Sequence, residues 1–350
     1  VALMPGTGEY SLATTPVYYS SGPAAQQAAN INSPSGKTDL VTSVEALGAE
    51  VPNCSATSLV VSWFGDDLRC GACTVRPKVE TQFEGSQPWS VSGLGRSAVQ
   101  VIAQVDDRPI YGGTPSDASV VEAIRHLNEV GQGVMFYPFI LMDQQEANGL
   151  PDPWTGGDDQ PALPWRGRIT LSVAPGQAGT PDGTGTADTE VAAFFGTASA
   201  ADFTVGDGAV TYTGPAEWGL RRFILHYAAL CAAAGGVEAF CIGSEMRGLT
   251  QIRGDGGGFA AVAALRDLAA EVRGLLGADC KIGYAADWSE YFGYQPDDDS
   301  GDRYFHLDPL WADANIDFVG IDNYMPLSDW REGSDHLDAC AGTIDDLDDL

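Results

Sequence analysis

The chain has 350 residues, of which 48 are acidic and 18 basic, so its formal net charge is -30, and 44% of its residues are hydrophobic. Single domains usually have about 100–200 residues, so this apolar content is enough for one large core or two modest ones, and disorder is excluded as the main state. An acidic surface repels phosphate groups and anionic lipid headgroups, which excludes nucleic acid and membrane surfaces as expected partners.

The ends of the chain carry no targeting pattern. No basic flank followed by an apolar core, as in a signal peptide, occurs after Val1, and no apolar run reaches the length of a membrane span. The chain opens at Val1 rather than at Met and ends in a helix-like acidic segment at 345–350 without a stop signal. We therefore expect a piece of a longer protein.

The N-terminal residues differ in composition from the rest. Residues 1–36 are rich in Gly, Pro, Ser, Ala and Gln without a sustained period, which predicts an extended lead-in. Apolar residues at helical spacing predict a short amphipathic helix over 37–50. We therefore expect an N-terminal arm with a short helix over 1–50 and one domain over 51–350.

Strand-like apolar runs alternate with helix-like segments along that domain. The runs that we interpret as strands are 58–64, 134–140, 169–173 (the weakest), 237–242, 280–284 and 316–321. The main helices are predicted over 118–130, 218–234 and 259–276. This alternation indicates an α/β protein with a parallel sheet, either a TIM-type (β/α)8 barrel or an open doubly wound sheet. A dinucleotide-binding sheet is disfavoured, because no Gly-x-Gly-x-x-Gly follows an early strand.

The predicted fold class is therefore a TIM-type barrel. A barrel needs eight strands, and the pattern shows six. The other two are cryptic in the long polar inserts at 66–115 and 143–217 or lie beyond Leu350, and we favour the second alternative. The inserts are rich in Gly and Pro and predict loops and hairpins at one mouth of the barrel.

Functional side chains of a parallel barrel follow the C-terminal ends of its strands. Carboxylates and aromatic side chains dominate these positions, and the candidates are Trp63, Asp143, Glu245, Asp287, Trp288, Asp322, Asn323 and Tyr324. Glycosidic cleavage needs one protonated and one ionised carboxyl group, and flat aromatic faces stack on sugar rings. The sequence therefore predicts sugar chemistry, with Trp63, Trp288 and Trp330 as stacking platforms. The alternative for each tryptophan is a place in the core.

Glu245 is the strongest catalytic candidate. A buried apolar run delivers it to the end of a strand, and the small Gly243-Ser244 pair before it lets a substrate approach closely. The structural alternative is that Glu245 serves only as a cap or as an ion-pair partner of Arg247 or Arg253.

No cofactor or metal is expected. Seven cysteines, an odd number spread along the chain, predict buried free thiols rather than a disulfide framework. Cys70-x-x-Cys73 has the spacing of a metal site, but no second pair follows. The aspartate-rich turn at 297–302 lacks the spacing of a calcium loop, so a solvated turn is the better interpretation.

Several motifs resemble a known family. Glu245 resembles the acid/base position of retaining glycoside-hydrolase barrels, and 317–327 resembles the sixth-strand segment of mannanase-like members. Longer motifs look like the glycoside-hydrolase TIM-barrel-like domain of large tail-tip proteins in gene transfer agents and related phages. These motifs are 61–70, 111–117, 137–143, 150–154 and 164–170.

The resemblance implies a baseplate component, made in the bacterial cytoplasm, that resides in the tail of a virion or virus-like particle. Its partners would be a cell-envelope glycan and other tail proteins, with a homotrimer as one arrangement. Family members of the retaining type place a nucleophile after the seventh strand, which we expect beyond Leu350. Two functions stay open: a retaining glycoside hydrolase with Glu245 as acid/base, and a non-catalytic structural or receptor-binding module.

Overall fold

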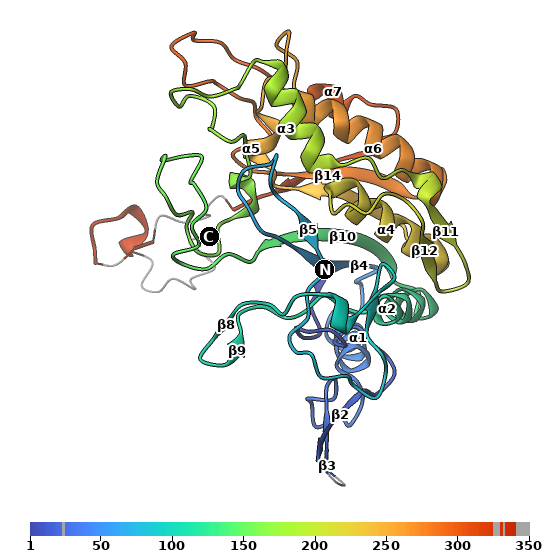
Figure 1. The fold of residues 1–350 in the computed structure, drawn as a ribbon. Helices are drawn as coiled ribbons and strands as arrows, with labels where there is room; N and C mark the ends of the chain where they lie inside the picture. The colour runs from blue at the N-terminus through green and yellow to red at the C-terminus, as the bar shows by residue number, and fades with distance from the viewer. Residues whose placement is uncertain (23–24, 325–329, 332, 341–350) are drawn as a thin grey trace.

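Parallel strands curled into a half-barrel form the centre of the protein (Figure 1). The computed structural model describes residues 1–22, 25–324, 330–331 and 333–340. Within these residues six parallel strands follow one another across the sheet: β1 (Ala2–Leu3), β4 (Ala56–Gly65), β10 (Gly133–Met142), β13 (Ala239–Ser244), β14 (Lys281–Asp287) and β15 (Phe318–Asp322). The short strand β5 (Val75–Arg76) pairs antiparallel with β4. The α/β, TIM-barrel-like fold class is thus confirmed.

Helices connect the parallel strands on the outside of the sheet (Figure 1). They are α1 (Asp39–Glu50), α2 (Asp117–Glu129), α3 (Gly185–Phe195), α4 (Leu220–Ala233), α5 (Arg247–Thr250), α6 (Ala260–Leu276) and α7 (Asp308–Trp311). The Ser116 side chain begins α2 by accepting a hydrogen bond from the backbone N–H of Ser119 at 3.1 Å. Helix α4 is buried along nearly its whole length, because it packs against the sheet, α6 and the segment 203–212.

The inserts form loops, 3-10 turns and small hairpins. The hairpins are β2 (Tyr18–Gly22) with β3 (Ala25–Ala28), β6 (Ser90–Val91) with β7 (Leu94–Gly95), β8 (Gln104–Val105) with β9 (Arg108–Pro109), and β11 (Phe203–Val205) with β12 (Val210–Tyr212). The 3-10 helices are η1 (Arg96–Ala98), η2 (Arg166–Arg168), η3 (Ala200–Asp202) and η4 (Leu337–Cys340). Residues 325–327 of the resembling segment and the acidic end at 345–350 lie outside the described residues.

One predicted strand is wrong. Residues 169–173 do not join the sheet, because the backbone of Thr170 exchanges hydrogen bonds with Leu68 and Cys70 in the neighbouring loop. Ile169 and Leu171 are buried all the same, which explains the apolar run. Strand β1, which was not predicted, takes the place of this strand in the count, so the described residues still contain six parallel strands. Strand β13 is still the fourth of them along the chain.

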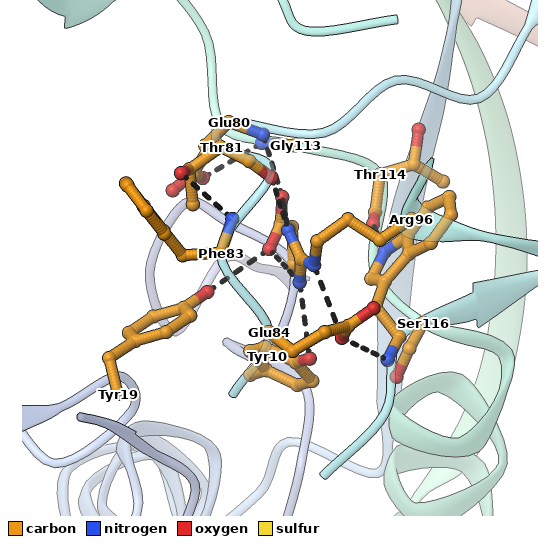
Figure 2. Close-up of polar contacts among 12 residues, drawn as sticks. Tyr10, Tyr19, Glu80, Thr81, Phe83, Glu84, Arg96, Gly113, Thr114 and Ser116 are labelled. Atoms are coloured by element: carbon orange, nitrogen blue, oxygen red, sulfur yellow. Dashed lines mark hydrogen bonds and ion pairs between the residues drawn. The ribbon is translucent and has the colours of Figure 1, made fainter. Parts of the chain in front are cut away.

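The N-terminal residues contact both the sheet and the first insert. Strand β1 pairs with β4. Figure 2 shows the polar network that joins the following residues to the first insert. There Arg96 forms a fully buried ion pair with Glu9 at 2.7 Å, Tyr19 donates to Glu9 at 3.1 Å, and the Glu80 backbone N–H donates to Glu9 at 2.6 Å. Because a buried charge is costly without partners, this network fixes the N-terminal residues against the insert.

Candidate functional site

An open cleft of about 500 Å³ lies where β13, β14 and β15 end. Its lining consists of Phe139, Trp165, Arg166, Glu245, Asp287, Trp288, Ser289 and Tyr324. Four of the predicted site residues, Glu245, Asp287, Trp288 and Tyr324, are therefore brought together in one cleft. The position agrees with the rule that parallel strands present functional groups at their C-terminal ends.

The backbone presents Glu245 to this cleft in an unusual conformation. The pairing of β13 with β14 shifts register between Cys241 and Ser244, and Glu245 has a φ of +50°. Its N–H donates to the carbonyl of Ala285 at 2.8 Å. A left-handed conformation at a non-glycine residue is strained, and such strain is concentrated at functional sites.

The Glu245 carboxylate is 4% exposed and is held on one oxygen. Its Oε2 accepts a hydrogen bond from Trp165 Nε1 at 2.8 Å and forms an ion pair with Arg166 at 3.0 Å. Arg166 also donates to the Ser244 carbonyl and hydroxyl, both at 2.9 Å, and its guanidinium lies 3.7 Å from the centre of the Phe139 ring. The ion-pair partner is thus Arg166, while Arg253 pairs with Asp182. Among the described residues Oε1 accepts no hydrogen bond.

A second carboxyl group lies beside Glu245. Burial raises the pKa of Asp322 to about 6, and the neighbouring charge of Glu245 adds to the increase, while a hydrogen bond from Tyr137 opposes it. Tyr137 donates to Asp322 Oδ2 at 2.7 Å. The raised pKa means that the protonated form of Asp322 persists to higher pH than that of an exposed aspartate. Burial, followed by the charge of Glu245, also raises the pKa of Tyr324.

Trp288 is fixed at the wall of the cleft by a tight turn. The Asp287 carboxylate accepts hydrogen bonds from the Ser289 backbone N–H at 2.7 Å and from its hydroxyl. The backbone N–H of Trp288 donates a hydrogen bond to the backbone carbonyl of Asp322 at 3.0 Å. Trp288 is 40% exposed and lines the cleft, so part of it is accessible to a ligand. Asn323 follows Asp322 at the exposed end of β15.

Two predicted site residues have other roles. Trp63 has 0% exposure; it packs against Phe223 and donates its Nε1 hydrogen to Tyr227 at 2.9 Å. It belongs to the core and cannot be a stacking platform. Asp143 forms a buried ion pair with Lys78 at 2.8 Å, which ties the first insert to the end of β10. It does not line the cleft.

Sequence reasoning missed Trp165, Arg166 and Phe139 as site residues. Trp165 and Arg166 come from the second insert, far from any strand end in the chain. The only sequence signal for these two was their place in the resembling motif at 164–170. Their role depends on the insert folding back over β13, which no local pattern encodes.

The described residues contain no cluster of three or more histidine, cysteine or acidic side chains arranged to bind a metal ion. Five of the seven cysteines are buried free thiols, and burial raises the pKa of Cys73 to about 12. In the same part of the chain we find no helix with the length and apolar character for crossing a membrane.

The sequence model of the family described as GTA TIM-barrel-like domain matches residues 218–350, which include β13, β14 and β15. Among solved structures, the chain is similar to a complex of a GH113 β-1,4-mannanase, with 14% identity and a TM-score of 0.40, over 84% of this chain and 59% of that chain.

A second similar structure is the GH113 β-mannanase AaManA from Alicyclobacillus acidocaldarius in complex with ManMIm, with 14% identity and a TM-score of 0.40, over 82% of this chain and 56% of that one. The chain thus spans less than two thirds of these solved structures. No curated protein matches the chain.

Proposed function

We propose that the chain is a carbohydrate-active barrel that binds and cleaves a glycan of the bacterial cell envelope, with Glu245 as acid/base. One observation carries the proposal: the cleft holds a strained, partnered glutamate surrounded by the aromatic side chains of Trp165, Trp288 and Tyr324. Aromatic faces around a carboxylate suit a sugar ring and the bond next to it.

The contacts of Glu245 support a role in proton transfer. Trp165 and Arg166 orient the carboxylate through Oε2, so that Oε1 is the oxygen left to exchange a proton with a leaving group. Asp322 supplies a second carboxyl group near Glu245, and burial raises the pKa of Asp322 to about 6. A retaining mechanism also needs a nucleophilic carboxylate about 5 Å from the acid/base, and we assign no described residue to that role.

The charges of the cleft favour a substrate without acidic groups. Glu245 and Asp287 line it, and the one guanidinium among the lining residues, Arg166, is paired with Glu245. Like charges in a cleft of low dielectric repel strongly. We therefore expect neutral or amino-sugar units rather than uronic or phosphorylated ones.

We also propose that the chain acts in the tail of a phage-like particle, in contact with other baseplate proteins. The motif resemblance and the match to the GTA TIM-barrel-like domain over 218–350 support this placement. The substrate would then be the envelope of the cell that the tail reaches.

A second candidate is a module that binds glycan without cleaving it. The ion pair with Arg166 and the 4% exposure of Glu245 favour it, because the carboxylate is held inside the protein by a charged partner rather than presented openly to a ligand. Such a module would keep the aromatic cleft and its affinity for sugars.

The test uses the longer parent protein, isolated cell-wall glycans and two variants. Glu245→Gln removes the carboxyl group assigned as acid/base, and Glu129→Gln is the matched control at the exposed end of α2. We expect the wild type and Glu129→Gln to release reducing ends, and Glu245→Gln to bind but not to release them. Equal release by all three proteins would overturn the assignment of Glu245. Glycan binding by all three proteins without release of reducing ends would favour the second candidate. Absence of glycan binding by all three would refute both candidates.

A further inference from the structure

Glu290 is a fully buried acid next to the cleft, with 0% exposure. Its Oε1 accepts hydrogen bonds from the Thr250 hydroxyl at 2.6 Å and the Tyr284 hydroxyl at 2.9 Å. Its Oε2 accepts one from the Asp287 backbone N–H at 3.1 Å. A carboxylate that accepts only from donors on three different residues ties together the segments that carry those donors.

One of these connections leads to Glu245. The Tyr284 hydroxyl, which donates to Glu290, accepts a hydrogen bond from the backbone N–H of Met246 at 2.8 Å. Met246 directly follows Glu245, whose φ of +50° persists only if its surroundings hold it. The chain from Glu290 through Tyr284 to Met246 therefore holds the strained turn that presents Glu245.

The other connection leads to Trp288. Glu290 closes the turn after β14 twice: its carboxylate accepts from the Asp287 N–H, and its own N–H donates to the Asp287 carbonyl at 2.8 Å. Trp288 lies inside this turn and lines the cleft. The same buried side chain thus fixes both walls of the candidate site.

We propose that Glu290 is a positioning residue whose ionised carboxylate holds Glu245 and Trp288 in their cleft arrangement and couples that arrangement to pH. The inference adds a positioning residue to the proposed function. It rests on that function only in treating the cleft as a glycan site.

The surroundings of Glu290 place its ionisation in the neutral range. Burial raises its pKa to about 7, against the hydrogen bonds of Thr250, Tyr284 and Asp287, which lower it, and the Asp287 charge adds a smaller increase. Behind Thr250 lies His306, with its Nε2 3.4 Å from the Thr250 hydroxyl. Burial and then the charge of Arg247 lower the pKa of His306 to about 4, so His306 stays neutral while Glu290 titrates.

Protonation changes the partners of Oε1 and removes the negative charge from the whole carboxyl group. A proton on Oε2 would face the Asp287 N–H, which cannot accept it, so the proton must sit on Oε1. The Thr250 hydroxyl must then turn to accept, and it can donate instead to the Arg247 carbonyl at 3.3 Å. The bond between Thr250 in α5 and Glu290 is therefore rearranged when the carboxylate gains a proton, and the bonds from Tyr284 and Asp287 weaken because they lose a charged acceptor.

The experiment follows intrinsic tryptophan fluorescence of the chain from about pH 5.5 to about pH 8.5, without sugar. We expect the wild type to show one transition with a midpoint near pH 7. The transition should be smaller in Trp288→Phe and absent in Glu290→Gln. It should be retained in Asp322→Asn, a variant that removes the other acid with a raised pKa near the cleft. Tyr284→Phe, which deletes one donor, should move the midpoint upward, because the ionised form loses a hydrogen bond.

A transition that is unchanged in Glu290→Gln, or no transition in the wild type, would overturn the inference. If Glu290→Gln fails to fold, the midpoint of Tyr284→Phe decides: an unchanged or lower midpoint contradicts the inference. A parallel titration with neutral cell-wall oligosaccharides separates the two proposals. Absence of binding refutes the glycan function, whereas the fluorescence result bears on Glu290 alone.

Discussion

Replacement of Glu290 by Gln should change how the stability of the protein depends on pH. Burial raises the pKa of Glu290 from its ordinary 4.5 to about 7. An acid whose pKa is raised by folding binds its proton more tightly in the folded state. Its stabilising contribution is therefore complete below about pH 4.5 and is lost as the pH rises through about 7. One pKa unit corresponds to about 1.4 kcal/mol, so the total loss is about 3 kcal/mol.

The assay is urea unfolding of the wild type and Glu290→Gln at a series of pH values between about 5 and about 8.5. Other titrating groups, such as Asp322, contribute to both curves and cancel in the difference between the proteins. We expect the wild type to lose about 2.5 kcal/mol more than the variant across this range, because part of the total loss already occurs below about pH 5. A difference that stays constant with pH would refute the reasoning, because it would mean that Glu290 has the same pKa in the folded and unfolded chains.

Three further predictions concern the cleft and the core. Trp165→Phe removes the hydrogen bond to Glu245 but keeps an aromatic face. This variant should lower the rate of glycan cleavage, while its free energy of unfolding changes by only about 1 kcal/mol. Unchanged cleavage kinetics would contradict the role of that hydrogen bond. Arg166→Met leaves the buried Glu245 charge unpaired and should destabilise the protein by about 3–5 kcal/mol in urea unfolding. Adding Glu245→Gln should restore part of that loss, and strict additivity of the two changes would contradict the ion pair. Trp63→Ala should cost about 3–5 kcal/mol in the same assay because Trp63 is fully buried. Trp288→Ala should instead weaken oligosaccharide binding measured by calorimetry, and the reverse pattern would show that the two tryptophans have been assigned the wrong roles.

The sequence predicted those elements whose signal is local. The apolar runs at 58–64 and 134–140 are found as β4 and β10, and the helix predicted over 259–276 is α6 (Ala260–Leu276). Such elements are predictable because burial of a strand or of one helix face requires the spacing that the residues display. Strand β1 has two residues and no such pattern, so only its pairing with β4 shows that it belongs to the sheet.

Some residues of the candidate site could be predicted from the sequence, and others could not. Glu245, Asp287, Trp288 and Tyr324 could be predicted, because parallel strands carry whatever follows them to the same edge of a sheet. Trp63 satisfied the same rule but faces the core, since the rule gives the edge and not the direction of a side chain.

The partners of the site residues were decided by tertiary structure alone. Trp165 and Arg166 reach Glu245 from an insert about 80 residues away in the chain, and Glu290 acts through the hydroxyl groups of Thr250 and Tyr284. Sequence periodicity records which residues are buried in one element. It cannot record which elements meet, because such contacts depend on how loops close in three dimensions.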